Sequence, residues 1–383
     1  MKRLKAVHQF HAGSGYGDGI TNAMLFIRRL LRGLGVKSEI FVEHVAPELA
    51  GEVLPYIRYQ DGPDQLLLVH HSMGHGLEVW LSTIKAPKVL VYHNITPPEF
   101  FPNDERNRIG VVAGRAQLAR WARGVFIGAI AVSPFNAKEL AALGYEPLAT
   151  IPLLVDLDRL RAAATHAPVA KNRDVAEILF VGRLTEHKCQ HDLIEAFATL
   201  RSQLSRPSRL TLVGTGAEPY LSRLHAQAAA LGLDSAVRFA GRLLDEELYA
   251  TYQGADLFIC LSEHEGFCMP LVEAAAFGVP VLAYDAGNVA DTVGEGGIVL
   301  STKAPEVVAA AAKLLLEEPA LRRRVIEGQI RTLARYEPAV LLRSLASFLR
   351  TLDFEMPGPP SLKSAPPSTL RIEGPFDSSY SLA

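Results

Sequence analysis

Hydrophobic positions gather in short runs that alternate with longer amphipathic windows along most of the chain. Short apolar runs bounded by Gly, Pro or polar residues are typical of buried strands, and the windows between them have helical spacing. This alternation predicts an α/β fold with two doubly wound parallel sheets. The strands are expected at Leu4–Phe10, Ser38–Val42, Gln65–His70, Lys88–His93 and Gly128–Val132, and then at Glu177–Val181, Arg209–Val213, Val237–Ala240, Leu257–Leu261 and Pro280–Ala283.

The same pattern divides the chain into two Rossmann-like domains. We expect the first over residues 1–155 and the second over 175–335, joined by a linker at 156–174 that lacks a strong period. A helix at 336–352 is expected to pack back on the first domain. Residues 353–383 are rich in Pro and Ser, which predicts a linker-like tail. The tail ends in "LRIEGPFDSSYSLA", which is similar to the start of a further module.

Composition narrows the function classes. The 383 residues are 49% hydrophobic and 21% charged with a net charge of −2, which disfavours a nucleic-acid binder. The cysteines Cys189, Cys260 and Cys268 fit no metal or disulfide spacing, and no signal-like start is seen. No apolar run is long enough to span a membrane. We therefore expect a cytoplasmic protein.

The stretch "SEHEGFCMPLVEAAAFGVPVLA" (262–283) carries two acids around a turn at a strand's carboxyl end. Ligands bind at such ends in open parallel sheets, and the loop N–H groups form a nest for an anion or a hydroxyl. Glu273 is expected in the first helical turn. Taken singly, Glu273 is an ordinary helix-start acid and Glu265 a solvated loop residue. The nest would consist of the N–H groups of Gly266, Phe267 and Cys268.

A second strand end supplies cations. In "EILFVGRLTEHKCQHDLIEAF" (177–197), Arg183 and Lys188 precede a helix, which is the arrangement of a diphosphate clamp. Each alone could be a surface cation. Gly214 and Gly216 mark another strand end, where a lone Gly-x-Gly is weak evidence.

Together these segments resemble the retaining glycosyltransferases of family 4, which have the GT-B fold. The matching motifs are "GRLTEHK", "VGTGAE", "VRFAGRL", "SEHEGF…LVEAAAFGVPV" and "DTVGEGGIVL". The resemblance implies a hexosyltransferase whose first domain serves the acceptor and whose second binds a nucleotide sugar. One departure is Cys189, because the family usually has glycine after the clamp lysine.

The resemblance also implies roles. Glu273 would hold the ribose, Glu265 would lie by the donor sugar, and the diphosphate would meet the two clamp cations, Arg183 and Lys188. No metal and no cofactor is then needed besides a UDP-sugar or GDP-sugar donor, because preorganised cations stabilise the leaving group. Further donor contacts would come from Gly214, Arg242, Leu243, Gly266, Phe267 and Cys268.

The first domain offers a Gly-rich loop and several histidines. The loop Gly13–Gly19 can approach a diphosphate closely, and Gly17 and Gly19 are its expected donor contacts. His93 stands where the family commonly has a histidine facing the donor sugar; the alternative is a structural strand-end histidine. The other strand-end histidines, at positions 70, 71 and 75, lack a zinc pattern.

Alternatives stay open at this point. The basic helix predicted within residues 106–126 could contact a membrane that carries a lipid-linked acceptor, or it could be a solvated surface helix. The acceptor could be a glycan, a lipid-linked sugar or a small molecule. An epimerase or a non-catalytic binder could share the fold. A nicotinamide oxidoreductase is disfavoured because the first turn lacks the required glycine spacing.

Overall fold

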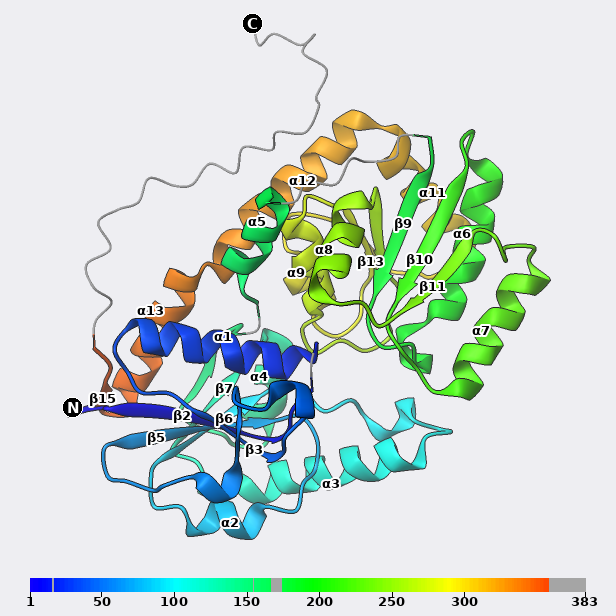
Figure 1. Cartoon of the computed structure of the whole chain (residues 1–383). Helices are drawn as coiled ribbons and strands as arrows, with labels where there is room; N and C mark the ends of the chain where they lie inside the picture. Colours follow the sequence, from blue (N-terminus) through cyan, green and yellow to red (C-terminus); the bar gives the residue numbers. More distant parts are fainter. Residues whose placement is uncertain (16, 154, 167–173, 358–383) are drawn as a thin grey trace, which may run out of the picture.

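Two parallel β-sheets form the centres of two domains (Figure 1). The computed structural model describes residues 1–15, 17–153, 155–166 and 174–357. The N-terminal sheet has the strand order β4-β3-β2-β5-β6-β7-β8 and the C-terminal sheet the order β11-β10-β9-β12-β13-β14. The N-terminal strands are β2 (Ala6–Gly13), β3 (Ile40–His44), β4 (Leu54–Pro55), β5 (Gln65–His71), β6 (Lys88–Tyr92), β7 (Gly128–Ala131) and β8 (Leu148–Thr150). The C-terminal strands are β9 (Ala176–Val181), β10 (Ser208–Val213), β11 (Val237–Gly241), β12 (Leu257–Cys260), β13 (Val281–Tyr284) and β14 (Ile298–Leu300).

The predicted α/β class with two doubly wound sheets is confirmed, and all ten predicted strands are present. Every ladder in both sheets is parallel, as the alternation of strands and helices requires. The strands that were not predicted are at most three residues long, among them β4, β8 and β14. Such short segments leave no periodic signal in the sequence.

Helices connect successive strands and begin at recognisable caps. Asp18 caps α1 by accepting a hydrogen bond from the N–H of Thr21 at 2.9 Å, and Ser133 caps α4 in the same way. The N-terminal helices are α1 (Gly19–Gly33), α2 (Glu78–Thr83), α3 (Glu105–Trp121) and α4 (Pro134–Ala142), with 3₁₀ turns η1 (Pro47–Leu49), η2 (Tyr56–Arg58) and η3 (Pro98–Phe100). The C-terminal helices are α6 (Gln190–Gln203), α7 (Glu218–Ala230), α8 (Asp245–Gly254), α9 (Met269–Ala276), α10 (Val289–Val293), α11 (Pro305–Glu317) and α12 (Pro319–Leu333), with η4 (Glu186–Lys188) and η5 (Ala334–Tyr336).

The chain passes between the domains twice. The first passage contains helix α5 (Leu157–His166), which occupies much of the segment expected to be a linker. The second leads from α12 through η5 into α13 (Pro338–Thr351). The two passages are tied together, because the guanidinium of Arg161 on α5 donates to both carboxylate oxygens of Glu337 at 3.1 and 2.5 Å.

Helix α13 returns to the N-terminal domain (Figure 1). Its apolar face joins the core cluster that contains Leu68 and Ile130 of the N-terminal sheet. After α13, β15 (Phe354–Glu355) pairs in parallel with β1 (Lys2–Arg3). The core residues of α13 are Leu341, Leu345, Phe348 and Leu349. The Pro/Ser-rich tail from residue 358 onward lies outside the described residues.

The basic helix α3 has a mixed surface. Its arginines Arg108, Arg115 and Arg120 pair with glutamates at 2.6–2.8 Å, whereas Ile109 and Val112 remain exposed. Among the described helices, none combines the length and apolar character needed to cross a membrane.

We predict that Leu349→Ala lowers the free energy of unfolding of the N-terminal domain by about 2–5 kcal/mol, because it removes a fully buried side chain and leaves a cavity. Urea unfolding followed by tryptophan fluorescence measures this, since both tryptophans, Trp80 and Trp121, lie in the N-terminal domain. Ile109→Ala on α3 is the matched control because Ile109 lies in the same domain and is 60% exposed. Equal small losses in both variants would contradict the packing role of α13.

Candidate active site

The carboxyl ends of β9 and β12 bring a buried ion pair together. Lys188, at the end of η4, places its Nζ 2.7 Å from Oε1 of Glu265, which lies in the loop after β12. The lysine side chain is 17% exposed and the glutamate side chain 8%. The two loops are also joined by the backbone, because Glu263 N–H donates to the carbonyl of His187 at 2.8 Å. The sequence placed these two side chains in separate motifs, and the fold joins them.

The two members of this pair keep each other charged. Burial alone would raise the pKa of Glu265, but the ammonium of Lys188 and the hydrogen bonds of nearby side chains hold it below its ordinary value. Burial alone would lower the pKa of Lys188, but the Glu265 carboxylate holds it above its ordinary value. Both groups are therefore ionised at neutral pH.

Cys189 takes the place expected for glycine after the lysine. It adopts the left-handed conformation with φ of 53°, the geometry that glycine would enter without strain. Its side chain is 1% exposed, and its Sγ lies 3.3 Å from Nζ of Lys303. The cysteine thus preserves the turn that starts α6 while filling a buried position.

The Gly residues at the ends of β9 and β10 allow the loop that carries Arg183 to pack closely. A Cβ on Gly214 would lie 1.9 Å from the carbonyl oxygen of Gly182, and one on Gly216 would lie 2.1 Å from that of Leu184. This close approach explains both β10 glycines without a ligand. Arg183 itself is exposed, and no carboxylate pairs with it among the described residues.

The loop before α9 presents unused backbone donors. Within the described part of the chain, the N–H groups of Gly266, Phe267 and Cys268 have no hydrogen-bond acceptor. Cys268 has φ of 68°, which turns the chain sharply into the helix. The three N–H groups thus form the kind of nest that binds anions or sugar hydroxyls.

Glu273 is held by a tyrosine. Tyr252 donates its hydroxyl to Oε2 of Glu273 at 2.7 Å, and burial raises the pKa of the glutamate despite this bond. Helix α9 starts at Met269, so Glu273 lies in the second turn, and its expected place in the first turn was wrong. One of its oxygens is fixed by Tyr252, which leaves the other for a ligand.

The remaining expected donor contacts lie around this loop. Gly19 faces it from the N-terminal domain, because a Cβ on Gly19 would lie 2.7 Å from Cε of Met269. Gly17 has φ of 74° in the same Gly-rich loop. Arg242 and Leu243 follow β11 in the C-terminal domain, Arg242 exposed and Leu243 partly buried.

A hydrogen-bond chain fixes the proton positions on His93. Gln9 donates its amide to Met24 O at 2.9 Å, so its Oε1 accepts from Nε2–H of His70 at 3.1 Å. His70 Nδ1 must then accept from Nε2–H of His93, at 2.7 Å. Burial lowers the pKa of His93 to about 3, which keeps the ring neutral. His93 Nδ1 is left as a buried acceptor without a partner among the described residues.

Direct contacts hold the two domains together beside the ion pair. Ser133 Oγ donates to the carbonyl of Gly266 at 2.6 Å, and His264 Nε2 lies 2.7 Å from Oδ1 of Asn94. A Cβ on Gly266 would lie 2.4 Å from Cβ of Asn94, so only glycine allows this approach. The rings of Phe100 and Phe101 also contact those of His187 and His264.

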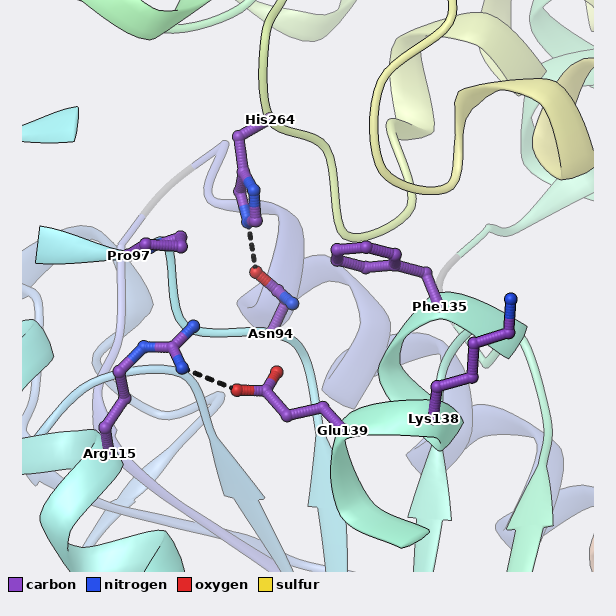
Figure 2. A pocket seen from close by; sticks show the side chains of 7 residues that line it. All are labelled: Asn94, Pro97, Arg115, Phe135, Lys138, Glu139 and His264. Carbon is purple, nitrogen blue, oxygen red and sulfur yellow. Dashed lines mark hydrogen bonds and ion pairs between the residues drawn. The ribbon is translucent and has the colours of Figure 1, made fainter. Parts of the chain in front are cut away.

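A cavity of about 380 Å³ opens beside these contacts (Figure 2). Arg115 pairs with Glu139 at 2.7 Å on one side of it, and Lys138 stands apart from that pair. None of its residues was predicted as a site residue, although Asn94 directly follows His93. The cavity is lined by Asn94, Pro97, Arg115, Phe135, Lys138, Glu139 and His264.

The turn after β13 also contributes to the site, and the sequence motifs did not predict it. Asn288 N–H donates to the carbonyl of Glu265 at 2.8 Å, and its Oδ1 accepts from the N–H of Phe135 at 3.3 Å. Gly287 has φ of 61°, and a Cβ there would lie 2.2 Å from the same Glu265 oxygen. The sequence "AGN" at a strand end was the available signal.

Two groups of potential metal ligands come together among the described residues, and both already contact a lysine. One contains Cys260, Glu265 and Cys268, and the other contains Cys189, His191 and Asp192. Lys188 pairs with Glu265, and Lys303 lies 2.6 Å from Asp192. A cation in either group would be repelled by the ammonium, so we assign no metal. His70, His71 and His75 belong to neither group.

Comparison with known families identifies the domain that carries this site. Residues 163–331 match the model of the family "Glycosyl transferases group 1". The C-terminal half of the chain is thus similar to the domain that this family model describes. This region contains the buried ion pair, the N–H nest and Glu273.

Curated relatives match the same part. The D-inositol 3-phosphate glycosyltransferase of Corynebacterium urealyticum is 34% identical over 45% of this chain and 42% of its own length. The GDP-mannose-dependent alpha-(1-6)-phosphatidylinositol monomannoside mannosyltransferase of Mycobacterium tuberculosis is 30% identical over 57% of this chain and 60% of its own. The matches thus span about half the length of these relatives.

Solved glycosyltransferase structures match nearly the whole chain. A glycosyltransferase from Rickettsia africae has a TM-score of 0.70 at 16% identity, covering 91% of this chain and 98% of that one. Anabaena Alr3699/HepE, solved with UDP and glucose, has a TM-score of 0.68 at 21% identity, covering 91% and 100%. At this identity the likeness shows the fold, which is GT-B, as the resemblance implied.

We predict that Lys188→Met destabilises the C-terminal domain by about 3–5 kcal/mol at neutral pH, because it leaves the Glu265 carboxylate buried and unpaired. In the parent, Glu265 stabilises the fold above its ordinary pKa of 4.5 and loses this effect as the pH falls through the lowered value. In Lys188→Met, burial instead raises the pKa of Glu265, so the stability deficit grows as the pH rises from 4 to 8.

Calorimetric melting over this pH range measures the effect. The double variant Lys188→Met/Glu265→Gln should recover most of the loss and show a flatter pH dependence. An additive double variant would mean that the two groups do not interact.

Proposed function

We propose that the chain is a retaining glycosyltransferase that transfers a hexose from a nucleotide diphosphate-sugar to an acceptor held by the N-terminal domain. The observation that carries the proposal is the Lys188–Glu265 pair, which lies beside the free N–H groups at the entry to α9 and on the same strand-end surface as Arg183. Two similar proteins support the donor class: a GDP-mannose-dependent mannosyltransferase and a protein solved with UDP and glucose.

The cations suit the departure of a nucleoside diphosphate. Cleavage of the sugar–phosphate bond leaves negative charge on the diphosphate, and preorganised cations lower the free energy of that transition state. Lys188 is fixed in place by Glu265, whereas Arg183 is exposed and free to reach the phosphates. Fixed side-chain cations can supply this charge without a metal.

The two glutamates, Glu273 and Glu265, contact different halves of the donor. Glu273, with one oxygen fixed by Tyr252, accepts the ribose hydroxyls. Glu265 and the N–H groups of Gly266 and Phe267 meet the sugar. His93 accepts a hydrogen bond from a sugar hydroxyl at Nδ1. This atom is buried without a hydrogen-bond partner among the described residues, so a ligand donor would satisfy it.

The cavity on the N-terminal side holds the acceptor. It lies where His264, next to Glu265, meets Asn94, next to His93, so an acceptor there faces the donor sugar (Figure 2). A second binding space beside the donor site favours transfer over an epimerase or a binding protein. Lys138 supplies a cation at the rim of this space that Glu139 does not neutralise, since Glu139 pairs with Arg115.

The donor assignment predicts different losses for the two glutamates. Glu273→Gln should weaken binding of the free nucleoside diphosphate about tenfold, because it removes a charged acceptor of ribose hydroxyls. Glu265→Gln should leave that affinity nearly unchanged and lower turnover of the intact donor. Calorimetry with UDP and GDP, and donor hydrolysis across UDP-, GDP- and ADP-sugars, measure the two effects. Equal losses of nucleotide affinity would contradict this division.

The diphosphate assignment predicts that Lys188→Ala lowers kcat about 10²-fold or more in protein that is still folded at the assay temperature. Lys313→Ala is the control, because Lys313 is a partly exposed surface lysine on α11. Unchanged turnover in a folded Lys188→Ala protein would remove Lys188 from the diphosphate site.

The acceptor assignment predicts that Lys138→Ala raises the acceptor KM several-fold and leaves the affinity for the nucleoside diphosphate unchanged. Steady-state kinetics with the acceptor varied, beside nucleotide calorimetry, separate the two quantities. An unchanged acceptor KM would place the acceptor elsewhere.

A further inference from the structure

Two of the three cysteines meet beneath the ion pair. Cys260 ends β12 and Cys268 precedes α9, and their Sγ atoms lie 3.9 Å apart. Cys260 Sγ also lies 3.2 Å from Oγ of Ser262 and 3.8 Å from Oε1 of Glu265. Both cysteines are free thiols with 2% and 8% exposure. Neither thiol has a part in the transfer reaction proposed above.

The two thiols differ in reactivity. The hydrogen bond with Cys268 lowers the pKa of Cys260 against the opposing effects of burial and of the Glu265 carboxylate, and the Ser262 hydroxyl and the Lys188 ammonium also lower it. The pKa of Cys268 is raised by that same hydrogen bond and by burial. A thiolate is the nucleophile in thiol oxidation, so Cys260 reacts first. Cys189 differs from both, because burial raises its pKa to about 12.

We propose that Cys260 and Cys268 form a reversible disulfide when the protein meets hydrogen peroxide, and that this bond switches off donor binding. The Cys260 thiolate attacks one peroxide oxygen, the O–O bond breaks, and the resulting hydroxide takes a proton to leave as water. The Cys268 sulfur then attacks the sulfenic sulfur of Cys260 and expels a second water. In total, two thiols lose two electrons and two protons, and peroxide is reduced to water.

The disulfide changes the donor site by geometry. A disulfide has an S–S distance of about 2.0 Å, so the sulfurs must approach each other by nearly half of their present separation. Cys268 carries one of the three nest N–H groups and has φ of 68°, so a pull on its side chain reorients the nest. The bond also removes the contact of Cys260 with Glu265, the partner of Lys188.

Peroxide reaches the pair through the donor site. Peroxide is little larger than water, and Lys188, whose partner Glu265 contacts Cys260, has a side chain that is 17% exposed. A bound nucleoside diphosphate would cover this route. The effect on binding rests on the proposed function, whereas the disulfide does not.

Intact mass spectrometry of the full chain tests the bond. After limited peroxide treatment, the mass of the protein should fall by the mass of two hydrogen atoms. Reduction with dithiothreitol should restore the original mass. Digestion with a glutamate-specific protease cuts at Glu263 and Glu265, between the two cysteines, so the bond appears as linked peptides that separate on reduction. Cys189→Ser should still form the bond, and Cys268→Ser should carry a dimedone-trappable sulfenic acid on Cys260. Addition of oxygen atoms without linked peptides would overturn the proposal.

Calorimetry with UDP and GDP tests the switch. The oxidised protein should bind the preferred nucleotide at least tenfold more weakly than the reduced protein, and Cys260→Ser should bind it equally before and after peroxide. Saturating nucleotide should slow bond formation. A disulfide that leaves nucleotide affinity unchanged would refute the switch. If the reduced protein binds neither nucleotide, the proposed function fails, and the mass measurement still decides whether the bond forms.

Discussion

The buried contact between Lys188 and Glu265 is the interaction on which the site depends. An ammonium or a carboxylate taken out of water alone is costly, so each of these groups is tolerated at its depth only because the other is present. The pairing fixes the loop after β9 against the loop after β12, and with it the position of the N–H nest and of His264. Removal of either partner would therefore disturb charge and loop geometry together.

The protein surrounds this contact with backbone that only certain residues can adopt. Gly266 approaches Asn94, Gly287 approaches the carbonyl of Glu265, and Gly214 approaches the carbonyl of Gly182, each at a distance that a Cβ would prevent. Cys189 and Cys268 accept left-handed conformations at the starts of α6 and α9. Strain of this kind persists where surrounding packing enforces it, and it is often found at ligand sites.

The sequence predicted the ten long strands because their apolar runs are bounded by turn residues. It missed β4 and β14, which are too short to show a period, and it missed α5, whose Ala/Arg composition hides the buried Leu157 and Leu160. At the site, motifs pointed to Lys188 and Glu265 separately. Their contact could not be predicted, because it forms only when the fold brings the two loops together. The same holds for Asn94 and His264, which meet across the two domains, although His264 lies within the quoted motif "SEHEGF".

The ion pair between Arg161 and Glu337 has a mechanical consequence. It clamps the two chain passages between the domains to each other, so they act as a single hinge rather than two separate tethers. Two domains joined by a single hinge can rotate about it, but the hinge restricts sliding and twisting of one domain against the other. Separation of the domains must then break the direct contacts between them, such as that of Asn94 with His264. The directions in which the domains can move apart are thus limited by how the two passages are joined.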